Sequence, residues 1–395
     1  MLDTPNTTVT RVRTTHELHV GAMLRRLDWL LIAGIAGLVI YGLKAVADIT
    51  ANAVPGDPRY YLARQELYAV IGTIGFVVAA ALNPDLYRRY WRILYALAIA
   101  GLVLVPLLGV AKRGSRRWLD IGSFQFQPSE FGKVLLVLAL AGFLADRRRA
   151  LSDARTVAGV LVLFAIPTAL VFFQPDLGTA LVYAAMTSAI LLVAGTRWSH
   201  LAVLTAIATT VSVLVLWVLP ALGVNVLATY QKERLTGFIH PSSDPQGATY
   251  NVSQSKIALG AGGLHGRGKA SATQSNLGFL PEPNTDFIFP AIGEQQGFIG
   301  CVALLGLYLL VVWRGMRALV NAGDGYSAVL VGGIVFALVF QVFVNAGMTM
   351  GIAPVTGIPL PLVSVGGSSM IANLAALGVL VGIQMRADRS SGRLL

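Results

Sequence analysis

One carboxylate, Asp286, lies between turn-forming residues and an apolar triplet in the stretch PEPNTDFIFP, residues 281–290. Its apolar neighbours would exclude water, which makes a carboxylate a stronger proton acceptor and a candidate general base. Asp286 could instead cap a helix that begins at Phe287, with Asn284 and Thr285 as competing caps. The residues alone leave both interpretations open. Glu294 follows about two helical turns later and could face the same cavity as Asp286.

Cations gather in a second stretch, KRGSRRWLDIGSFQFQPSE, residues 112–130. Lys112, Arg113, Arg116 and Arg117 would suit phosphate or pyrophosphate, because guanidinium groups bind phosphate through paired hydrogen bonds. The alternative is attraction to anionic lipid headgroups. Either way, this cluster is expected to bind phosphate-containing groups at a membrane surface.

Two acidic residues and a lysine lie where apolar helices are expected to begin. Glu130 follows Pro128 in what should be the first turn of a helix, and Lys133 lies three residues later on the same face. We expect a buried Glu130–Lys133 pair, because ionisable residues inside membrane spans are paired and are functional candidates by default. Asp176, in QPDLG, is favoured as a helix cap. Lys44, in the first apolar run, has no partner that the sequence reveals.

A fourth cluster, GIAPVTGIPLPLVSVGGSS, occupies residues 351–369. Its prolines and glycines interrupt an otherwise apolar run. Non-helical backbone at membrane depth is tolerated where it lines a cavity or is buried in protein. We favour the wall of a pocket over a plain turn.

The composition is that of an integral membrane protein. Hydrophobic residues make up 55% of the chain and charged residues 12%, with a mean hydropathy of +0.69, whereas soluble domains carry about 25% charged residues. The net charge of +11 comes from short clusters between apolar spans, so nucleic acid is not an expected partner. The single cysteine, Cys301, and the absence of P-loop, GxGxxG and HExxH motifs argue against nucleotide-driven transport, Rossmann cofactors and thiolate metal sites.

The apolar runs predict an all-α polytopic membrane protein with ten transmembrane helices. A bilayer core about 30 Å thick is crossed by about 20 apolar residues of helix. Runs of this kind lie at 28–49, 65–82, 91–111, 128–145, 157–173, 177–195, 201–220, 298–313, 327–348 and 368–385.

The distribution of cations predicts the orientation. Lysine and arginine are concentrated in the short loops on one side, which places both termini in the cytoplasm. The chain then consists of cytoplasmic tails at 1–27 and 386–395 and a membrane domain at 28–385. A large extracytoplasmic loop at 221–297 separates the seventh and eighth helices, and its apolar residues favour packing on the membrane domain over disorder. All four clusters map to this outer face.

The motifs, in their order, resemble the SEDS family (shape, elongation, division and sporulation), which includes the RodA, FtsW and SpoVE proteins. The resemblance rests on RRWLDIG…FQPSEFGK, QPDLGTAL, YQKERLTGFIHPSSDPQGATYNVSQSKIALGAGGLHGRG, FLPEPNTDFIFPAIGEQQG and GIAPVTGIPLPLVSVGGSS. QPDLGTAL and PVTGIPLPLVS look more like RodA, the elongation member. Asn284 stands where the family commonly has histidine, Val365 where it has tyrosine, and Gln295-Gln296 where it has Glu-Leu.

This resemblance implies a peptidoglycan glycosyltransferase that polymerises lipid II into β-1,4 glycan strands outside the bacterial cytoplasmic membrane, for cell elongation and rod shape. Asp286 matches the family's essential aspartate. The implied partners are a class B penicillin-binding protein as transpeptidase and membrane proteins of the elongation complex. No organic cofactor is expected, and a divalent cation, Mg²⁺ or Mn²⁺, could assist. Candidate substrate-binding residues are Arg116, Arg117, Trp118, Glu130, Lys133, Asp176, Lys232, Arg234, Lys256, Thr285, Ser364, Gly366, Gly367 and Ser368.

Three other functions compete with this one. A lipid II flippase would want polar groups through the full bilayer depth, whereas the ionisable residues here cluster at the outer face apart from Lys44 and Lys133. A division polymerase of the FtsW type would share the chemistry. A non-catalytic scaffold for the transpeptidase would not need Asp286. The outer ends of the eighth and ninth spans are the expected docking surface for the partner.

Overall fold

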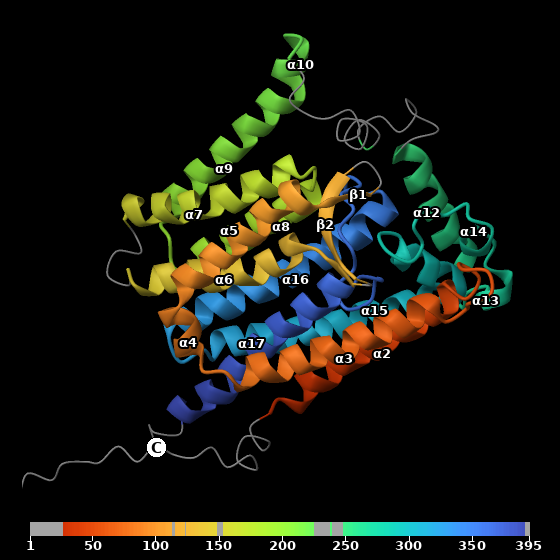
Figure 1. The fold of residues 1–395 in the computed structure, drawn as a ribbon, viewed down its shortest axis with the longest axis horizontal. Helices are drawn as coiled ribbons and strands as arrows, with labels where there is room; N and C mark the ends of the chain where they lie inside the picture. The colour runs from red at the N-terminus through yellow and green to blue at the C-terminus, as the bar shows by residue number, and fades with distance from the viewer. Residues whose placement is uncertain are drawn as a thin grey trace, which may run out of the picture.

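Long apolar helices, packed side by side, make up most of the chain in the computed structural model (Figure 1). The structure describes residues 27–112, 115–122, 124–147, 153–224, 238 and 248–391. Eight helices in this part are long and apolar enough to cross a membrane. They are α2 (Trp29–Ile49), α3 (Tyr60–Ala81), α5 (Trp91–Leu108), α6 (Pro128–Ala145), α7 (Ala154–Phe173), α15 (Ile288–Val320), α16 (Gly325–Met350) and α17 (Gly367–Ser391).

Two shorter apolar helices complete the set of expected spans. They are α8 (Leu177–Val193) and α9 (Trp198–Val213), and α9 continues through the π-helical turn η2 (Leu214–Val218) into α10 (Leu219–Ala221). Each of the ten predicted spans overlaps one of these helices. The mostly helical membrane fold is therefore confirmed, while the count of ten crossings stays a prediction.

The connections contain elements that the sequence did not predict. A small antiparallel sheet of β1 (Val110–Lys112), β2 (Ser115–Ile121) and β3 (Phe124–Phe126) joins α5 to α6. The connections also contain four further helices, which are α4 (Pro84–Arg89), α12 (Ala248–Gly262), α13 (Gly268–Ser271) and α14 (Thr273–Asn276). We call the end of the bundle with the sheet the hairpin end, and the end where α2 begins and α17 finishes the terminal end.

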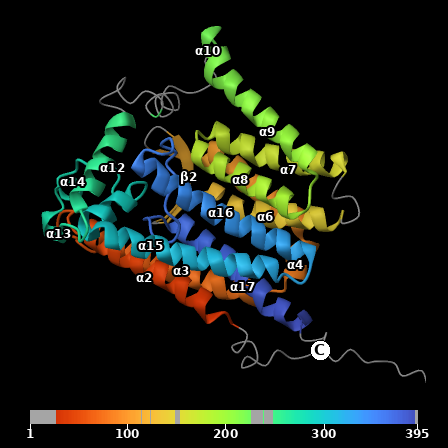
Figure 2. The ribbon, with the colours of Figure 1, turned by 180° about the vertical axis from the view of Figure 1, so that it is seen from behind.

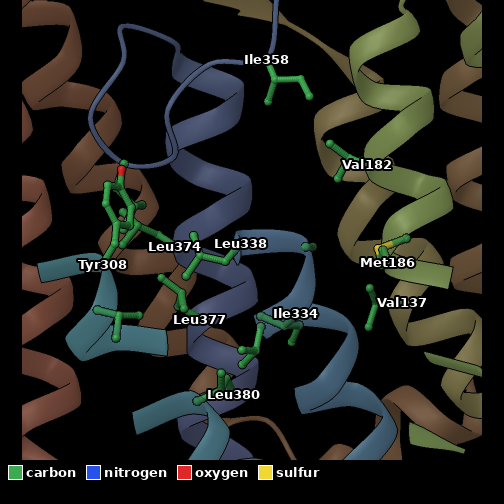
Figure 3. Close-up of a cluster of buried hydrophobic side chains, with 14 of the residues drawn as sticks. Val137, Val182, Met186, Tyr308, Ile334, Leu338, Ile358, Leu374, Leu377 and Leu380 are labelled. Atoms are coloured by element: carbon green, nitrogen blue, oxygen red, sulfur yellow. The ribbon is translucent and has the colours of Figure 1, made fainter. Parts of the chain in front are cut away.

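The core lies between α6, α8, α15, α16 and α17, where large apolar side chains interdigitate (Figure 3). Small residues allow closer approach elsewhere. At Gly378 of α17, an added Cβ would lie 2.3 Å from the Phe76 carbonyl oxygen of α3, and at Gly382 it would lie 2.7 Å from that of Ala80. The backbones of α3 and α17 therefore touch, a common way to pack helices in membranes.

Helix α15 is longer than the predicted eighth span. It begins at Ile288, and Gly297 interrupts its helical geometry with φ 69°. That left-handed conformation suits glycine. The predicted loop of 221–297 therefore ends earlier than expected, because hydropathy detects the apolar segment after the kink but not the more polar turns before it. Helix α17 likewise runs to Ser391, past the predicted end at 385.

Helix α9 differs from the other nine apolar helices of the described residues because none of its residues is buried. Figures 1 and 2 show α9 and α10 diverging from the rest of the bundle. Val203, Ile207 and Val211 are more than half exposed. These side chains need lipid to cover them.

At the terminal end, an ion pair joins three helices. Asp28 caps α2 through the Leu31 N–H and accepts hydrogen bonds from Arg314 of α15 (2.6 Å) and Gln384 of α17 (2.8 Å). The Asp28 side chain is only 5% exposed. Burial by itself would raise the pKa of Asp28, but the hydrogen bonds from Arg314, Gln384 and Leu31 outweigh it and lower the pKa below the ordinary value of 3.8.

We expect Asp28→Asn to lower stability by about 1–3 kcal/mol, because the charged hydrogen bonds to Arg314 are lost. The thermal midpoint of the purified protein in detergent measures this loss. Because the pKa of Asp28 is lowered, its contribution is present at neutral pH and declines as the pH falls through that lowered pKa. The exposed Arg59–Glu66 pair supplies the control: Glu66→Gln should leave the midpoint almost unchanged. An unchanged midpoint in Asp28→Asn would contradict the prediction.

Candidate functional site

The sequence motifs meet at the hairpin end of the bundle, where α5, α7 and α16 finish and α6, α8 and α17 begin (Figure 1). Two sets of hydrogen bonds lie there, and the segment 364–368 joins them. One set holds the Asp286 turn against residues 364–366, and the other runs from Ser368 through Gln127 and Asp176 to Arg117 of β2.

The turn that carries Asp286 is held by three consecutive carbonyl groups. The carbonyl oxygen of Asn284 accepts a hydrogen bond from the Val365 N–H (2.9 Å), that of Thr285 from Ser364 Oγ (2.6 Å) and that of Asp286 from Asn345 Nδ2 (2.9 Å). Asp286 is half-buried, whereas Phe287, Ile288 and Phe289 are buried. The backbone of Asp286 is therefore fixed to α16 and to the segment that precedes α17.

The position of Asp286 bears on the capping interpretation. Helix α15 starts at Ile288, so Phe287 and not Asp286 occupies the N-cap position. The helix of the capping alternative thus begins one residue later than that alternative placed it.

Glu294 is bound by residues of α14 (Thr273–Asn276). It is fully buried, and its carboxylate accepts hydrogen bonds from the Gln274 N–H (2.7 Å), the Ser275 N–H (2.9 Å) and Ser275 Oγ (2.7 Å). The expectation that Glu294 and Asp286 face one cavity is therefore wrong. Glu294 fixes the start of α14 instead.

The segment at 351–366 is held in place by Gln65 of α3. Gln65 is fully buried, donates to the Ser364 carbonyl oxygen (3.0 Å) and accepts from the Gly366 N–H (3.2 Å). Ser364 Oγ also accepts from the Leu360 N–H (2.9 Å). Ser364 and Gly366 thus shape the backbone beside Asp286, while the wall of a pocket at 351–369 stays a prediction.

The same segment continues to the arginine-bearing sheet. Ser368 Oγ donates to the Gln125 carbonyl oxygen of β3 (3.0 Å) and accepts from the Gln127 N–H (2.8 Å). An added Cβ at Gly367 would lie 2.8 Å from Phe124, so glycine allows β3 to pack on the start of α17. Gln127 in turn lies 3.3 Å from the Asp176 carboxylate.

Asp176 caps α8, as predicted, and also pairs with an arginine of β2. Its carboxylate accepts from the Thr179 N–H (3.2 Å) and Thr179 Oγ1 (2.9 Å). Arg117 lies 3.7 Å from it and donates to the Pro175 carbonyl oxygen. Arg117 is 17% exposed at the side chain, while Arg116 is exposed and Trp118 half-buried. Arg116 is therefore the more accessible of the two arginines of β2.

The buried Glu130–Lys133 pair is confirmed. Lys133 Nζ lies 2.8 Å from Glu130 Oε2 and 2.9 Å from Gln341 Oε1 of α16. Both charged residues are less than 10% exposed. They border a small cavity whose other lining residues are mostly apolar. The pair joins α6 to α16 one helical turn from Asn345.

The remaining predicted cations are less well placed or not described. Lys256 of α12 is exposed, and its Nζ lies close to Gly351, just after the end of α16. Lys44 is exposed on α2. Lys232 and Arg234 lie outside the described residues. Substrate contact by any of these residues stays a prediction.

Sequence analysis missed the buried amides of the site, Gln65, Gln341 and Asn345. Gln341 and Asn345 lie among apolar residues, Gln65 lies between Arg64 and Glu66, and each amide is at most 2% exposed. One amide averaged over about 20 residues lowers the mean hydropathy too little to interrupt a predicted span. The available signal was the cost of an unpaired amide in a membrane interior, which implies a specific partner.

The described residues contain no cluster of three or more histidine, cysteine, aspartate or glutamate side chains suited to a metal ion. Mg²⁺ needs only one or two protein carboxylates when it binds together with substrate phosphates. A site made entirely of protein ligands is therefore not supported by this part of the chain, and no step is assigned to a metal here.

The fold and site define a polytopic helical membrane protein with an anchored aspartate and nearby cations at one end of the bundle. A family model described as "Cell cycle protein", for the FtsW, RodA and SpoVE proteins, matches residues 23–389. The chain belongs to this family.

Curated proteins of similar sequence align with nearly the whole chain. The peptidoglycan glycosyltransferase MrdB of Escherichia coli K12 is 37% identical over 346 residues, covering 88% of this chain and 91% of MrdB. Stage V sporulation protein E of Bacillus subtilis is 34% identical over 359 residues, covering 90% and 94%.

Solved structures show the same fold. A chain from "Structural coordination of polymerization and crosslinking by a peptidoglycan synthase complex" is 30% identical with a TM-score of 0.75, covering 91% of this chain and 98% of that one. RodA of Thermus thermophilus is 29% identical with a TM-score of 0.64, covering 91% and 96%.

Proposed function

We propose that this protein is a peptidoglycan glycosyltransferase that polymerises lipid II into β-1,4 glycan strands. The observation that carries the proposal is the Asp286 turn, which is anchored through three carbonyl groups and joined to the cationic sheet by the segment 364–368 and its hydrogen bonds. This arrangement provides one carboxylate base beside groups that suit a pyrophosphate. Family membership and a relative named as a peptidoglycan glycosyltransferase support it.

The reaction needs few groups. A sugar hydroxyl attacks the anomeric carbon of a second sugar and passes its proton to the Asp286 carboxylate. The bond from that carbon to the polyprenyl pyrophosphate breaks, and negative charge develops on the leaving oxygen. Positioned cations stabilise this charge. Arg116 and Lys256 are exposed and available for that purpose, and Lys232 and Arg234 are further candidates.

The paired residues serve the proposed reaction differently. Glu130, Lys133 and Asp176 are buried and already engaged, and Arg117 is bound to Asp176 and Pro175. Their partners fix the surfaces around Asp286. Arg117 would reach a pyrophosphate only by exchanging one of these contacts for the phosphate, which bidentate binding would favour.

The cellular setting is part of the proposal. The hairpin end faces outward from the bacterial cytoplasmic membrane, with both termini in the cytoplasm, because short-loop cations concentrate near the terminal end. The partner is a class B penicillin-binding protein, and the role is cell elongation with other membrane proteins of that complex. The similar chain from a peptidoglycan synthase complex supports a transpeptidase partner. A divalent cation, Mg²⁺ or Mn²⁺, would enter together with the pyrophosphate.

The test is polymerisation by the purified complex in detergent, supplied with preformed lipid II and with the transpeptidase chemically inactivated. Glycan strands resolved on a gel would support a transferase, because a detergent solution has no second compartment for a transporter to fill. Lipid II that stays monomeric, while a control polymerase extends it, would refute the proposal. A flippase or scaffold would then be the function to test.

A further inference from the structure

Asn345 occupies an unusual place in α16. It is fully buried in an apolar helix, and both hydrogens of its amide are used: one bonds the Asp286 carbonyl oxygen at 2.9 Å, the other the Ile358 carbonyl oxygen at 2.8 Å. The Asn345 Oδ1 atom is buried and finds no partner among the described residues. An apolar residue of the same size would avoid that cost, so the two donated hydrogen bonds are what this side chain contributes.

We propose that Asn345 is a positioning residue for Asp286: its amide joins the backbone of the catalytic turn to the 351–366 segment and so sets where the carboxylate lies. This rests on the proposed role of Asp286 as the base. Asn345 touches the backbone of Asp286, and its part in the reaction is exerted through that residue.

The structure of the 281–287 turn explains why the two hydrogen bonds from Asn345 are needed. Residues 281–287 form no helix or strand, and their internal hydrogen bonds run back to the Glu282 carbonyl oxygen from Thr285 and Phe287. A turn held only by local bonds has freedom that a general base cannot tolerate, since catalytic groups must stay within about 0.5 Å of their working position. Asn345 supplies a tether at the reacting residue itself.

Asn345 also places the Asp286 turn on the same helix that contacts the Glu130–Lys133 pair. Gln341, one turn earlier on α16, accepts from Lys133 at 2.9 Å, so α16 carries both the contact to the ion pair and the contact to the Asp286 turn. Ser364 holds the neighbouring Thr285 carbonyl group. Without Asn345 the Asp286 carbonyl group would lose this hydrogen bond. The hydrogen bonds from Ser364 to Thr285 and from Lys133 to Gln341 would persist.

The test compares Asn345→Leu with a control on the same helix. Leucine has a similar size but no donors. Tyr326→Phe removes the hydrogen bond from Tyr326 to the Pro84 carbonyl oxygen (3.1 Å) at the opposite end of α16. Both variants are purified with the transpeptidase partner, and polymerisation of lipid II is measured per folded molecule across a range of pH. Wild type and Asp286→Asn are run in parallel.

We expect Asn345→Leu to lower kcat by about 10–100-fold, the range for a displaced catalytic group, with KM changed far less. The acid limb of its pH–rate profile should also move, because the displaced carboxylate meets new surroundings. Tyr326→Phe should keep the kcat and profile of wild type, whatever its stability. Wild-type kcat and pH profile in folded Asn345→Leu would overturn the proposal.

Two further measurements keep the outcome decisive. If Asn345→Leu does not fold, Asn345→Ser takes its place: the short hydroxyl cannot bridge both carbonyl groups, so a kcat at least several-fold below wild type is expected, and wild-type kcat overturns the proposal. Asp286→Asn separates the two hypotheses. Loss of polymer in Asp286→Asn together with normal kcat in the Asn345 variants overturns only the positioning role. Normal polymer from Asp286→Asn overturns the base and the positioning role together.

Discussion

Asp286→Asn should abolish glycan polymerisation, with a loss of at least about 10²–10⁴-fold, the range that general base catalysis supplies. Asparagine has the same size and leaves the three carbonyl contacts of the turn untouched, but its amide cannot accept the proton of the attacking hydroxyl. The variant should therefore fold, keep the thermal midpoint of wild type and still bind the transpeptidase. Glycan strands made from purified lipid II provide the measurement.

A carboxylate elsewhere at the same end supplies the control. Asp57 is exposed and accepts a hydrogen bond from the Arg59 N–H, so Asp57→Asn should retain wild-type polymer. Wild-type polymer from Asp286→Asn would contradict the assignment and direct the search to Glu130 and Asp176. It would also be the result that a non-catalytic scaffold requires.

The second large effect concerns the Glu130–Lys133 pair. Lys133→Met leaves the Glu130 carboxylate buried without its counter-charge, and Glu130→Gln leaves the Lys133 ammonium in the same state. Removing one partner of a buried pair costs about 3–5 kcal/mol. We expect each single variant to give little folded protein, and the double variant Glu130→Gln/Lys133→Met to recover much of the lost stability.

Thermal midpoints and the yield of monodisperse protein in detergent check this prediction. Activity of the double variant then separates two roles. A folded double variant without polymerisation would indicate that the charges act on the reaction, and one with normal polymerisation would limit the pair to joining α6 and α16. A double variant less stable than both single variants would contradict the prediction.

The helices could be predicted because each bilayer crossing demands a run of apolar residues. The Glu130–Lys133 pair and the Asp176 cap followed from local spacing, which helix geometry makes reliable. The placement of the four clusters at one face followed from the order of the spans and the distribution of cations. Spacing within one helix carries no information about which other helix lies beside it.

Other features depend on tertiary contacts and were missed. The β1–β2–β3 sheet has strands of three to seven residues, too short for an alternating pattern to emerge beside an apolar span. Asn345 and Gln65 are single amides whose role exists only once α3, α16 and the 351–366 segment meet. Glu294 is bound by the backbone N–H groups of Gln274 and Ser275 at the start of α14, a contact that no spacing in the sequence predicts.

Helix α9 has a consequence for how the protein responds to its surroundings. Because it buries no side chain, packing contributes little to its position, and the lipid around it contributes most. A helix held in this way adjusts its tilt to match the thickness of the hydrocarbon layer, at a cost of fractions of a kcal/mol per Å of mismatch. The helices around the buried core resist such adjustment. Bilayer thickness therefore acts on this molecule chiefly through one helix, and the acyl-chain length of the host membrane sets where α9 stands.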